Sequence, residues 1–406
     1  MKDGTELRPK IRPVEAFPVP GDAEGMFAVR DPSGISEQVL SMSEPALFIL
    51  SQFDGCNTLN DVAKAVASRY GQVVQQSTLV EMVGKLESGL MLEGPAFKAH
   101  MDELLAEYRS AKVRPSILGN ELGGPESAKA YLSKLLPLDD GEAAMGGEVV
   151  GLVAPHLDFP RGEPCYREAY RTLRGRQCPK RVCVLGTNHF GRATSVVATA
   201  KAFETPLGVT EVDTDFLEQV EQRCGHDLRE HEFDHKREHS VELQVLCLQH
   251  VFGAKSFKLV PFLCHDPCGP TGTRPVDGRG VDLGDFAEAL GAVIAQDGGD
   301  TLLVASADLS HVGSRFGDQF QLDEAFLESL ARRDRGALSR LAASEPEGFV
   351  QVLADDENAT RVCSAGCIYV VGQVLRDAKV TMLRYHQAFT EEQQICVSCT
   401  AMTYVR

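Results

Sequence analysis

The sequence contains no tryptophan, no excess of positive charge and no long apolar run. Its 41 lysines and arginines are outnumbered by 58 aspartates and glutamates, so the formal net charge is −17 at pH 7. A chain this acidic repels the phosphate backbone of DNA and RNA, and we therefore expect no nucleic-acid partner. The absence of tryptophan excludes no class of protein.

Two targeting features are also missing. The first ten residues, MKDGTELRPK, lack the apolar core of a secretory signal, and no apolar segment approaches the roughly 20 residues of a membrane-spanning helix. We therefore expect neither export nor a membrane partner. Twelve cysteines without an export signal favour a reducing compartment, where thiols stay free or bind metal, and the expected location is cytoplasmic.

The length of 406 residues predicts more than one domain. Residues 1–100 show the pattern of a short strand pair, at 26–36, and of three short helices. One of these helices, within 58–71, opens on Thr58, a good N-cap. Together these features predict a small winged-helix-like α+β domain. Residues 101–147 are polar and mostly helical, and we interpret them as a connector.

From residue 148 to 406 the pattern becomes that of an α/β domain. Short β-branched runs alternate with longer amphipathic stretches, as in a sheet with crossover helices. The expected strands are 148–154, 181–186, 258–263, 301–306, 380–385 and 395–405. The expected helices are 161–174, 214–223, 240–252, 284–296, 321–333 and 366–376.

Histidines follow three of these strands. The first strand leads to His156, the second to His189, and the fourth to Asp308 and His311. Ligands of open α/β sheets bind beyond the carboxyl ends of the strands, where the loops converge. One histidine in such a place is usually structural, whereas three from separate strands can face one cleft. The pattern alone leaves a structural role and a metal or acid–base site equally open.

Residues 230–244, EHEFDHKREHSVELQ, contain three histidines spaced by four, His231, His235 and His239. On a single helix these rings would share one face. The apolar helical pattern begins only after residue 240, however, so we expect the helix to start near Ser240, a good N-cap. His231 and His235 are then expected on a solvated loop.

Two cysteine patterns are weaker candidates for metal binding. Cys396 and Cys399 form a C-x-x-C inside an expected strand, where their side chains point to opposite faces. Cys264, His265 and Cys268 follow another strand, but a structural zinc site there would need a fourth ligand. We therefore favour buried or surface roles for both groups.

Residues 112–406 resemble the Memo family, component B of the AmmeMemoRadiSam group, which has the fold of class III extradiol dioxygenases. Six motifs in the family's order carry the resemblance: APH (154–156), GTNHFG (186–191), TPLGV (205–209), EHSVELQ (238–244), SADLSH (306–311) and RVCSAGCI (361–368). The resemblance implies a class III extradiol dioxygenase-like α/β domain that binds a metal.

The resemblance implies metal ligands at His156, His189 and Cys363. It also implies that His311 is the acid–base residue, with Asp308 beside it. In RVCSAGCI the family's pattern puts the ligand at the first cysteine.

His239 is the one histidine of its triplet that lies inside a family motif. We predict that it contacts the substrate or a metal ligand and does not bind the metal itself. It joins His311 and Asp308 as a candidate catalytic residue.

The donor atoms indicate which metals could bind. Two neutral imidazoles and one anion leave open positions on an iron(II)-like ion. A thiolate in place of the carboxylate of the dioxygenases is softer, so copper and zinc are also suitable. The expected cofactor is one divalent or redox metal ion, with iron(II) favoured.

The N-terminal segment is similar to the PqqD-like family, winged-helix modules that bind the leader segments of precursor peptides. The similarity lies in FDG (53–55), TLNDVAKAVASRYG (58–71) and KLESGLMLEG (85–94). It implies a peptide or protein substrate, or a radical-SAM protein as partner, whereas a packing or oligomerisation domain is the alternative. For the whole chain the expected substrate is a small molecule or a peptide.

The leading hypothesis is a Memo-type metalloprotein, a redox-metal-dependent oxidoreductase related to dioxygenases. The alternatives are a non-catalytic metal-binding scaffold and a protein that handles copper or iron.

Overall fold

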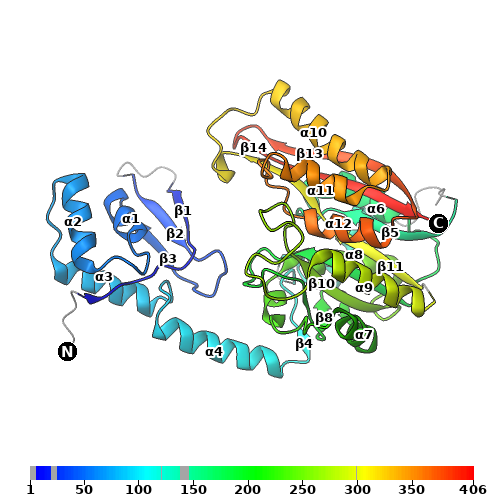
Figure 1. The fold of residues 1–406 in the computed structure, drawn as a ribbon, viewed down its shortest axis with the longest axis horizontal. Helices are drawn as coiled ribbons and strands as arrows, with labels where there is room; N and C mark the ends of the chain where they lie inside the picture. Colours follow the sequence, from blue (N-terminus) through cyan, green and yellow to red (C-terminus); the bar gives the residue numbers. More distant parts are fainter. Residues whose placement is uncertain (1–5, 20–24, 120, 138–145, 299) are drawn as a thin grey trace. The chain divides into compact units, whose positions relative to one another are not determined.

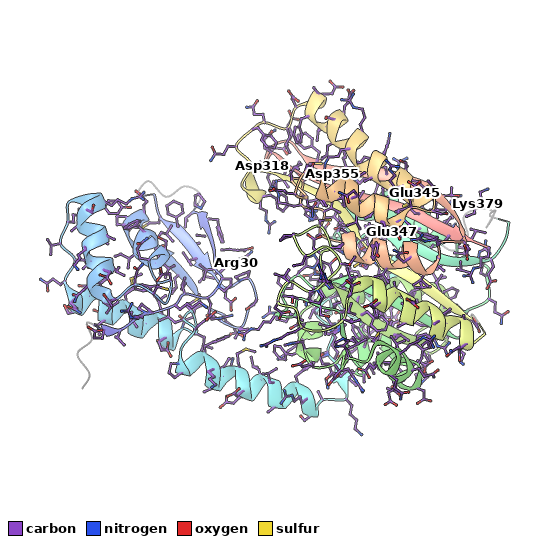
Figure 2. All side chains as sticks on the ribbon, in the orientation of Figure 1. Arg30, Asp318, Glu345, Glu347, Asp355 and Lys379 are labelled. Carbon is purple, nitrogen blue, oxygen red and sulfur yellow. The ribbon has the colours of Figure 1, made fainter. Side chains whose placement is uncertain are left out.

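A computed structural model of the chain describes residues 6–19, 25–119, 121–137, 146–298 and 300–406. The chain divides into two units, Met1–Ser110 and Ala111–Arg406 (Figure 1). Charged side chains such as those of Arg30, Glu347 and Lys379 are exposed (Figure 2). Within the described residues, no helix is both long and apolar enough to cross a membrane.

The first unit combines a small antiparallel sheet with four helices. Its strands, in the order β1-β2-β3, are β1 (Glu15–Pro18), β2 (Phe27–Arg30) and β3 (Val39–Met42). Its helices are α1 (Glu44–Ser51), α2 (Leu59–Tyr70), α3 (Gln76–Ser88) and α4 (Pro95–Ser110). Fully buried Val29, Phe53 and Leu59 belong to one core that joins the sheet to the helices. A strand pair was expected within 26–36; β2 lies there, but its partner β3 lies after residue 36. The winged-helix assignment stays a prediction.

The second unit is built on an eight-stranded mixed sheet. In order across the sheet, its strands are β12 (Asp308–Gly313), β14 (Ile395–Val405), β5 (Val149–Ala154), β11 (Thr301–Ser306), β6 (Arg181–Thr187), β10 (Lys258–Cys264) and β7 (Val197–Ala198), with β13 (Lys379–Thr390) paired to β14. The four strands β5, β11, β6 and β10 are parallel, so their carboxyl ends lie at the same edge. A separate three-stranded sheet contains β4 (Val113–Arg114), β8 (Ala202–Thr205) and β9 (Gly208–Thr210).

Helices cover both faces of the large sheet and complete a three-layer α/β fold (Figure 1). One face packs against α5 (Pro125–Leu135), α6 (Phe159–Arg171) and α8 (His239–Phe252). The other packs against α7 (Thr214–Cys224), α9 (Leu283–Gln296), α10 (Glu324–Ala342), α11 (Pro346–Ala354) and α12 (Ala365–Val374). Side chains of β6 alternate between the two cores, with Val182 and Val184 on one face and Cys183 and Leu185 on the other. The predicted α/β class is confirmed.

All six strands expected after residue 148 are present, and they position the site. Two differences concern length. Strand β13 continues to Thr390 because it stays paired with β14, and helix α10 extends to Ala342 instead of ending at 333. A third difference concerns Asp308 and His311, which lie on the additional strand β12. After β11 the Ala307 N–H donates to the Ala154 carbonyl, and the chain then pairs antiparallel with β14.

The boundary between the units falls after Ser110, inside the segment 101–147 that was expected to be a connector. The start of this segment is the second half of α4, and α5 packs against α6 and α8 of the second unit. Residues 120 and 138–145 of the segment lie outside the described residues.

Helix α2 begins with a capping box, in agreement with the predicted cap. The Thr58 hydroxyl accepts a hydrogen bond from the Asp61 N–H at 3.2 Å, and the Asp61 carboxylate accepts one from the Thr58 N–H at 3.1 Å. The neighbouring helix α1 has Ser43 at its N-cap, but the Ser43 side chain makes no capping hydrogen bond.

We expect Thr58→Ala to destabilise the first unit by about 1 kcal/mol, because the Asp61 N–H in the first turn of α2 loses its side-chain acceptor. Urea unfolding followed by circular dichroism measures the effect. Ser43→Ala is the matched control and should change the stability by much less. Equal effects of the two substitutions would contradict the assigned cap.

Candidate metal centre

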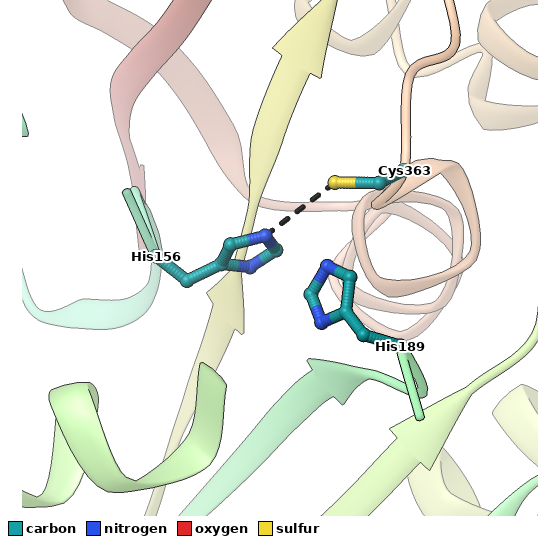
Figure 3. A group of neighbouring side chains, drawn as sticks. All are labelled: His156, His189 and Cys363. Carbon is teal, nitrogen blue, oxygen red and sulfur yellow. Dashed lines mark hydrogen bonds between the residues drawn. The ribbon is translucent and has the colours of Figure 1, made fainter. Parts of the chain in front are cut away.

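Two histidines and a cysteine converge at the carboxyl edge of the parallel strands (Figure 3). His156 follows β5 and His189 follows β6, and β11 lies between these strands in the sheet. Cys363 comes from the segment that enters α12. The Cys363 Sγ atom lies 3.4 Å from His156 Nε2. The two imidazole centroids are 4.8 Å apart, and one ligand atom from each of the three residues lies within 4.8 Å of the others.

His156 is held through its Nδ1 atom. This atom lies 3.0 Å from the Ser306 carbonyl oxygen, which can only accept, so Nδ1 carries the proton and Nε2 has a free lone pair. The main-chain N–H of His156 donates to Asp308 Oδ1 at 3.1 Å. Burial, together with the neighbouring His189 and His239, holds the pKa of His156 well below its usual range. The ring is therefore neutral, as a metal ligand must be.

His189 is held in the same way by a carboxylate. Its Nδ1 atom lies 3.1 Å and 3.2 Å from the two Glu238 oxygens, and its main-chain N–H donates to Glu238 at 2.9 Å. Burial opposes the charge on Glu238, but the adjacent His189 and His239 hold its pKa well below the usual range. Burial likewise opposes the charge on His189, but the Glu238 carboxylate raises its pKa well above the usual range.

The donor set fits a metal ion. Metal-ligating histidines characteristically give their second ring nitrogen to a carbonyl or carboxylate, which fixes the tautomer and the direction of the free lone pair. His156 and His189 both meet this condition, through Ser306 and Glu238. Because the Glu238 carboxylate raises the pKa of His189, a bound cation would have to displace a proton from that ring. Cys363 is partly exposed, and burial raises its pKa although His189 opposes the shift, so a bound cation would have to displace the thiol proton.

His239 joins this cluster at the first residue of α8. Its ring stacks on His189 with centroids 5.0 Å apart, and its Nδ1 atom lies 3.3 Å from a Glu238 oxygen. His189, Glu238 and His239 also lie close enough for metal binding. Glu238, however, already accepts hydrogen bonds from the His189 N–H and the Ser240 N–H in addition to its ring contact. Through these hydrogen bonds Glu238 supports His189.

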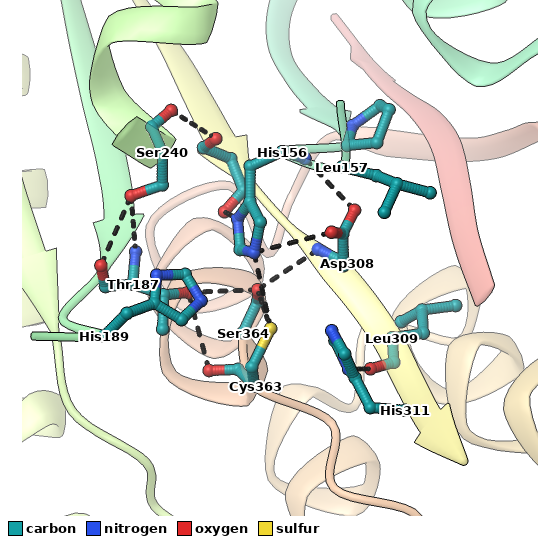
Figure 4. A network of polar contacts seen from close by, with 12 residues as sticks. His156, Leu157, Thr187, His189, Ser240, Asp308, Leu309, His311, Cys363 and Ser364 are labelled. Carbon is teal, nitrogen blue, oxygen red and sulfur yellow. Dashed lines mark hydrogen bonds and ion pairs between the residues drawn. The ribbon is translucent and has the colours of Figure 1, made fainter. Parts of the chain in front are cut away.

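His311 and Asp308 lie beside the cluster on β12 (Figure 4). His311 Nδ1 lies 3.0 Å from the Leu309 carbonyl and 3.2 Å from the Arg361 carbonyl, which leaves Nε2 with a free lone pair. Burial lowers the pKa of His311 to about 4. Burial also raises the pKa of Asp308 to about 7, and an Asp308 oxygen lies 3.5 Å from His156 Nε2.

The expectation of a solvated loop is correct for His231 and wrong for His235. His231 is exposed, whereas His235 is 1% exposed and its Nε2 lies 3.2 Å from the Val197 carbonyl of β7. The charged segment packs as a short 3-10 helix, Glu232–Lys236, against the edge of the sheet. Helix α8 starts one residue earlier than expected, and its N-cap is Glu238 instead of Ser240.

The weaker cysteine candidates do not join a group of three possible metal donors within the described residues. Within the described part of the chain, the groups of three or more donors are the two built on His189, and neither includes Cys264, Cys268 or the Cys396–Cys399 pair. Cys367 is 1% exposed, with its Sγ 3.8 Å from the Thr187 hydroxyl, so Cys363 is the cysteine of its motif that faces His156.

Glu238 and Ser306 were not predicted from the sequence. Glu238 directly precedes His239 at the expected helix start, and an acidic residue beside a histidine at that position is the signal that could have identified it. Ser306 contributes a main-chain carbonyl, which leaves no signal in the side-chain pattern.

This fold and site define an α/β protein with a candidate two-histidine, one-cysteine metal centre at the carboxyl edge of its sheet. A family profile described as "Memo-like protein" matches residues 124–403. The chain belongs to the Memo family.

Curated relatives are similar over most of the chain. A MEMO1 family protein of Aquifex aeolicus is 25% identical over 395 residues, which cover 95% of this chain and 98% of the relative. A MEMO1 family protein of Thermus thermophilus is 30% identical over 331 residues, which cover 81% of this chain and 93% of the relative. The similarity to the Aquifex protein therefore includes both units. An uncharacterized Escherichia coli K12 protein of known structure is 13% identical, over an alignment that covers 63% of this chain and 99% of that protein, with a TM-score of 0.37.

We expect iodoacetamide to modify Cys363 at least about tenfold faster than Cys367 in the native protein, because only Cys363 is partly exposed. Peptide mapping by tandem mass spectrometry separates the two sites. Denatured protein is the control, in which both should react at similar rates. Equal rates in the native protein would contradict the arrangement of the two thiols.

Proposed function

We propose that this chain is a metalloprotein that holds one redox-capable ion between His156, His189 and Cys363. We further propose that it acts as a redox-metal-dependent enzyme on a small molecule or a peptide. The observation that carries this proposal is that each histidine has Nδ1 engaged by an acceptor, which leaves its other nitrogen as the one that can bind an ion beside the thiol. Iron(II) is the favoured ion for such a set, and copper or zinc also suits it.

The bound ion would supply Lewis acidity and redox capacity next to open coordination positions. His311 would act as the proton acceptor. It is neutral near pH 7, since its pKa is about 4, and its Nδ1 proton is held by main-chain carbonyls. The free Nε2 can therefore take a proton from a substrate. Asp308, with a pKa of about 7, can hold or release a second proton at neutral pH.

The surroundings of these groups favour a substrate with an apolar part. The Phe316 ring lies 5.3 Å from the His311 ring, and it packs on buried Leu157 and Val397. The Phe190 ring lies 5.9 Å from His189 and is 43% exposed, so it offers an apolar surface beside the cluster.

We also propose a peptide substrate or a radical-SAM partner, and a cytoplasmic location. The similarity of the first unit to PqqD-like modules supports a peptide substrate or a radical-SAM partner. All twelve cysteines are free, which is compatible with the reducing cytoplasm.

We expect protein purified without oxygen to bind about one equivalent of metal, and His156→Ala/His189→Ala to lose it, because both nitrogen donors are removed. Mass-spectrometric metal analysis of the loaded and desalted proteins measures the difference. The control is His226→Ala/His231→Ala, which removes two exposed histidines outside the cluster. Equal metal content in the two double variants would contradict the proposed site.

A second test separates an enzyme from a metal-binding scaffold or a protein that handles copper or iron. We expect His311→Ala to keep the metal but to lose complementation of a deletion strain, because only the proton acceptor is removed. His250→Ala is the matched control, since its ring also binds a main-chain carbonyl, that of Leu136, away from the cluster. Full complementation by His311→Ala would favour the two non-catalytic alternatives.

A further inference from the structure

We propose that the buried ion pair of Arg114 and Glu242 positions Glu238 and, through it, the candidate ligand His189. This inference rests on the proposed metal site. Both side chains are 0% exposed, and neither belongs to the donor set or to the proton-transfer groups. Arg114 precedes Glu242 by 128 residues and is the last residue of the short strand β4.

The Arg114 guanidinium holds the turn that contains Glu238. Its Nε donates to the His235 carbonyl at 3.0 Å, and one terminal nitrogen donates to the Glu238 carbonyl at 2.7 Å. The other terminal nitrogen donates to the Pro115 carbonyl and to the Glu242 carboxylate. One planar group thus fixes both ends of the turn 235–238 and the first turn of α8.

Glu242 completes the arrangement on the opposite side. Its carboxylate accepts hydrogen bonds from the Ser116 hydroxyl at 2.6 Å, the Ile117 N–H at 3.1 Å and the Leu118 N–H at 3.2 Å. A buried ion pair adds little net stability unless its hydrogen bonds are completed, as they are at this pair. A well-supported role of such a pair is to select one geometry.

The geometry it selects is that of Glu238. With its main-chain carbonyl held by Arg114, the Glu238 side chain accepts from the His189 N–H, the His189 ring and the Ser240 N–H. Loss of the guanidinium frees the two carbonyls of the turn and leaves Glu242 as an unpaired buried charge. The carboxylate would then no longer fix the tautomer and direction of the His189 ring. Arg114 and Glu242 are therefore positioning residues.

A matched arginine separates positioning from general stability. Arg181 is 2% exposed and pairs with Asp213 and Asp297, so it resembles Arg114 in burial and charge. It stands at the first residue of β6, whereas His189 follows the other end of that strand. Removing Arg181 should destabilise the fold without changing the metal site.

The test is anaerobic titration of the full-length, metal-free protein with cobalt(II), followed by its thiolate charge-transfer and d–d absorption bands. Changes in the groups that support metal ligands typically weaken binding about 10–100-fold. Because Arg114 acts through Glu238, we expect Arg114→Met to weaken cobalt(II) binding about tenfold and to shift the d–d bands. Arg114→Lys should fall between this variant and the wild type, since it keeps the charge but not the planar fork. Arg181→Met should bind cobalt(II) as the wild type does, whatever its melting temperature.

Wild-type affinity and bands in Arg114→Met, or equal weakening by Arg181→Met, would overturn the positioning role. Glu242→Gln, which keeps the shape of the side chain, provides the same comparison if Arg114→Met does not fold. If the wild type itself shows no thiolate band, the proposed metal site fails, and this inference fails with it. If the wild type binds and the Arg114 variants do not differ from it, only this inference fails.

Discussion

The candidate metal centre depends on the hydrogen bonds of one buried carboxylate, that of Glu238. Glu238 accepts hydrogen bonds from the ring and the main-chain N–H of His189 and from the Ser240 N–H in the first turn of α8, and the His239 ring lies 3.3 Å from it. A carboxylate that is 1% exposed is stable only because these partners replace its hydration. The same bonds direct the other ring nitrogen of His189 toward His156 and Cys363. The hydrogen bonds that stabilise the buried charge therefore also set the geometry of the site.

The first turns of α8 also hold the strands that carry the site through buried hydrogen bonds. Its buried polar side chains each bind a different segment. Ser240 bonds to Thr187 at the end of β6, Glu242 to Arg114, and Gln244 to the Pro155 carbonyl just before His156. Gln244 also bonds to the Ser306 hydroxyl at the end of β11. One helix terminus therefore holds three neighbouring strand ends in register, which a metal site assembled from distant parts of the chain requires.

The sequence was informative where local patterns decide the structure. The apolar runs of β5, β6 and β11 are buried on both faces, so they predicted the strands and placed His156 and His189 at one edge. The choice of Cys363 came from a resemblance to the Memo family, and its thiol does face His156. Its role as a ligand stays a prediction.

Contacts between distant residues could not be predicted in this way. Strand β12 forms because β14, far along the chain, offers it a partner, and its short sequence DLSHVG gives no sign of that pairing. His235 looked solvated because its neighbours are charged. The Glu232 and Asp234 carboxylates instead accept hydrogen bonds from the segments on either side of β7. The buried His235 ring contacts the Val197 carbonyl of that strand. The pair of Arg114 and Glu242 shows the same limit, since periodicity indicates which residues are buried but not which of them meet.

The most direct test of the metal centre is an anaerobic crystal structure of the metal-loaded protein with anomalous data at the absorption edge of the ion. The predicted result is one anomalous peak within bonding distance of His156 Nε2, His189 Nε2 and Cys363 Sγ, with both Nδ1 atoms still bonded to Ser306 and Glu238. A peak at any other group of side chains, or one that contacts an Nδ1 atom of these histidines, would contradict it.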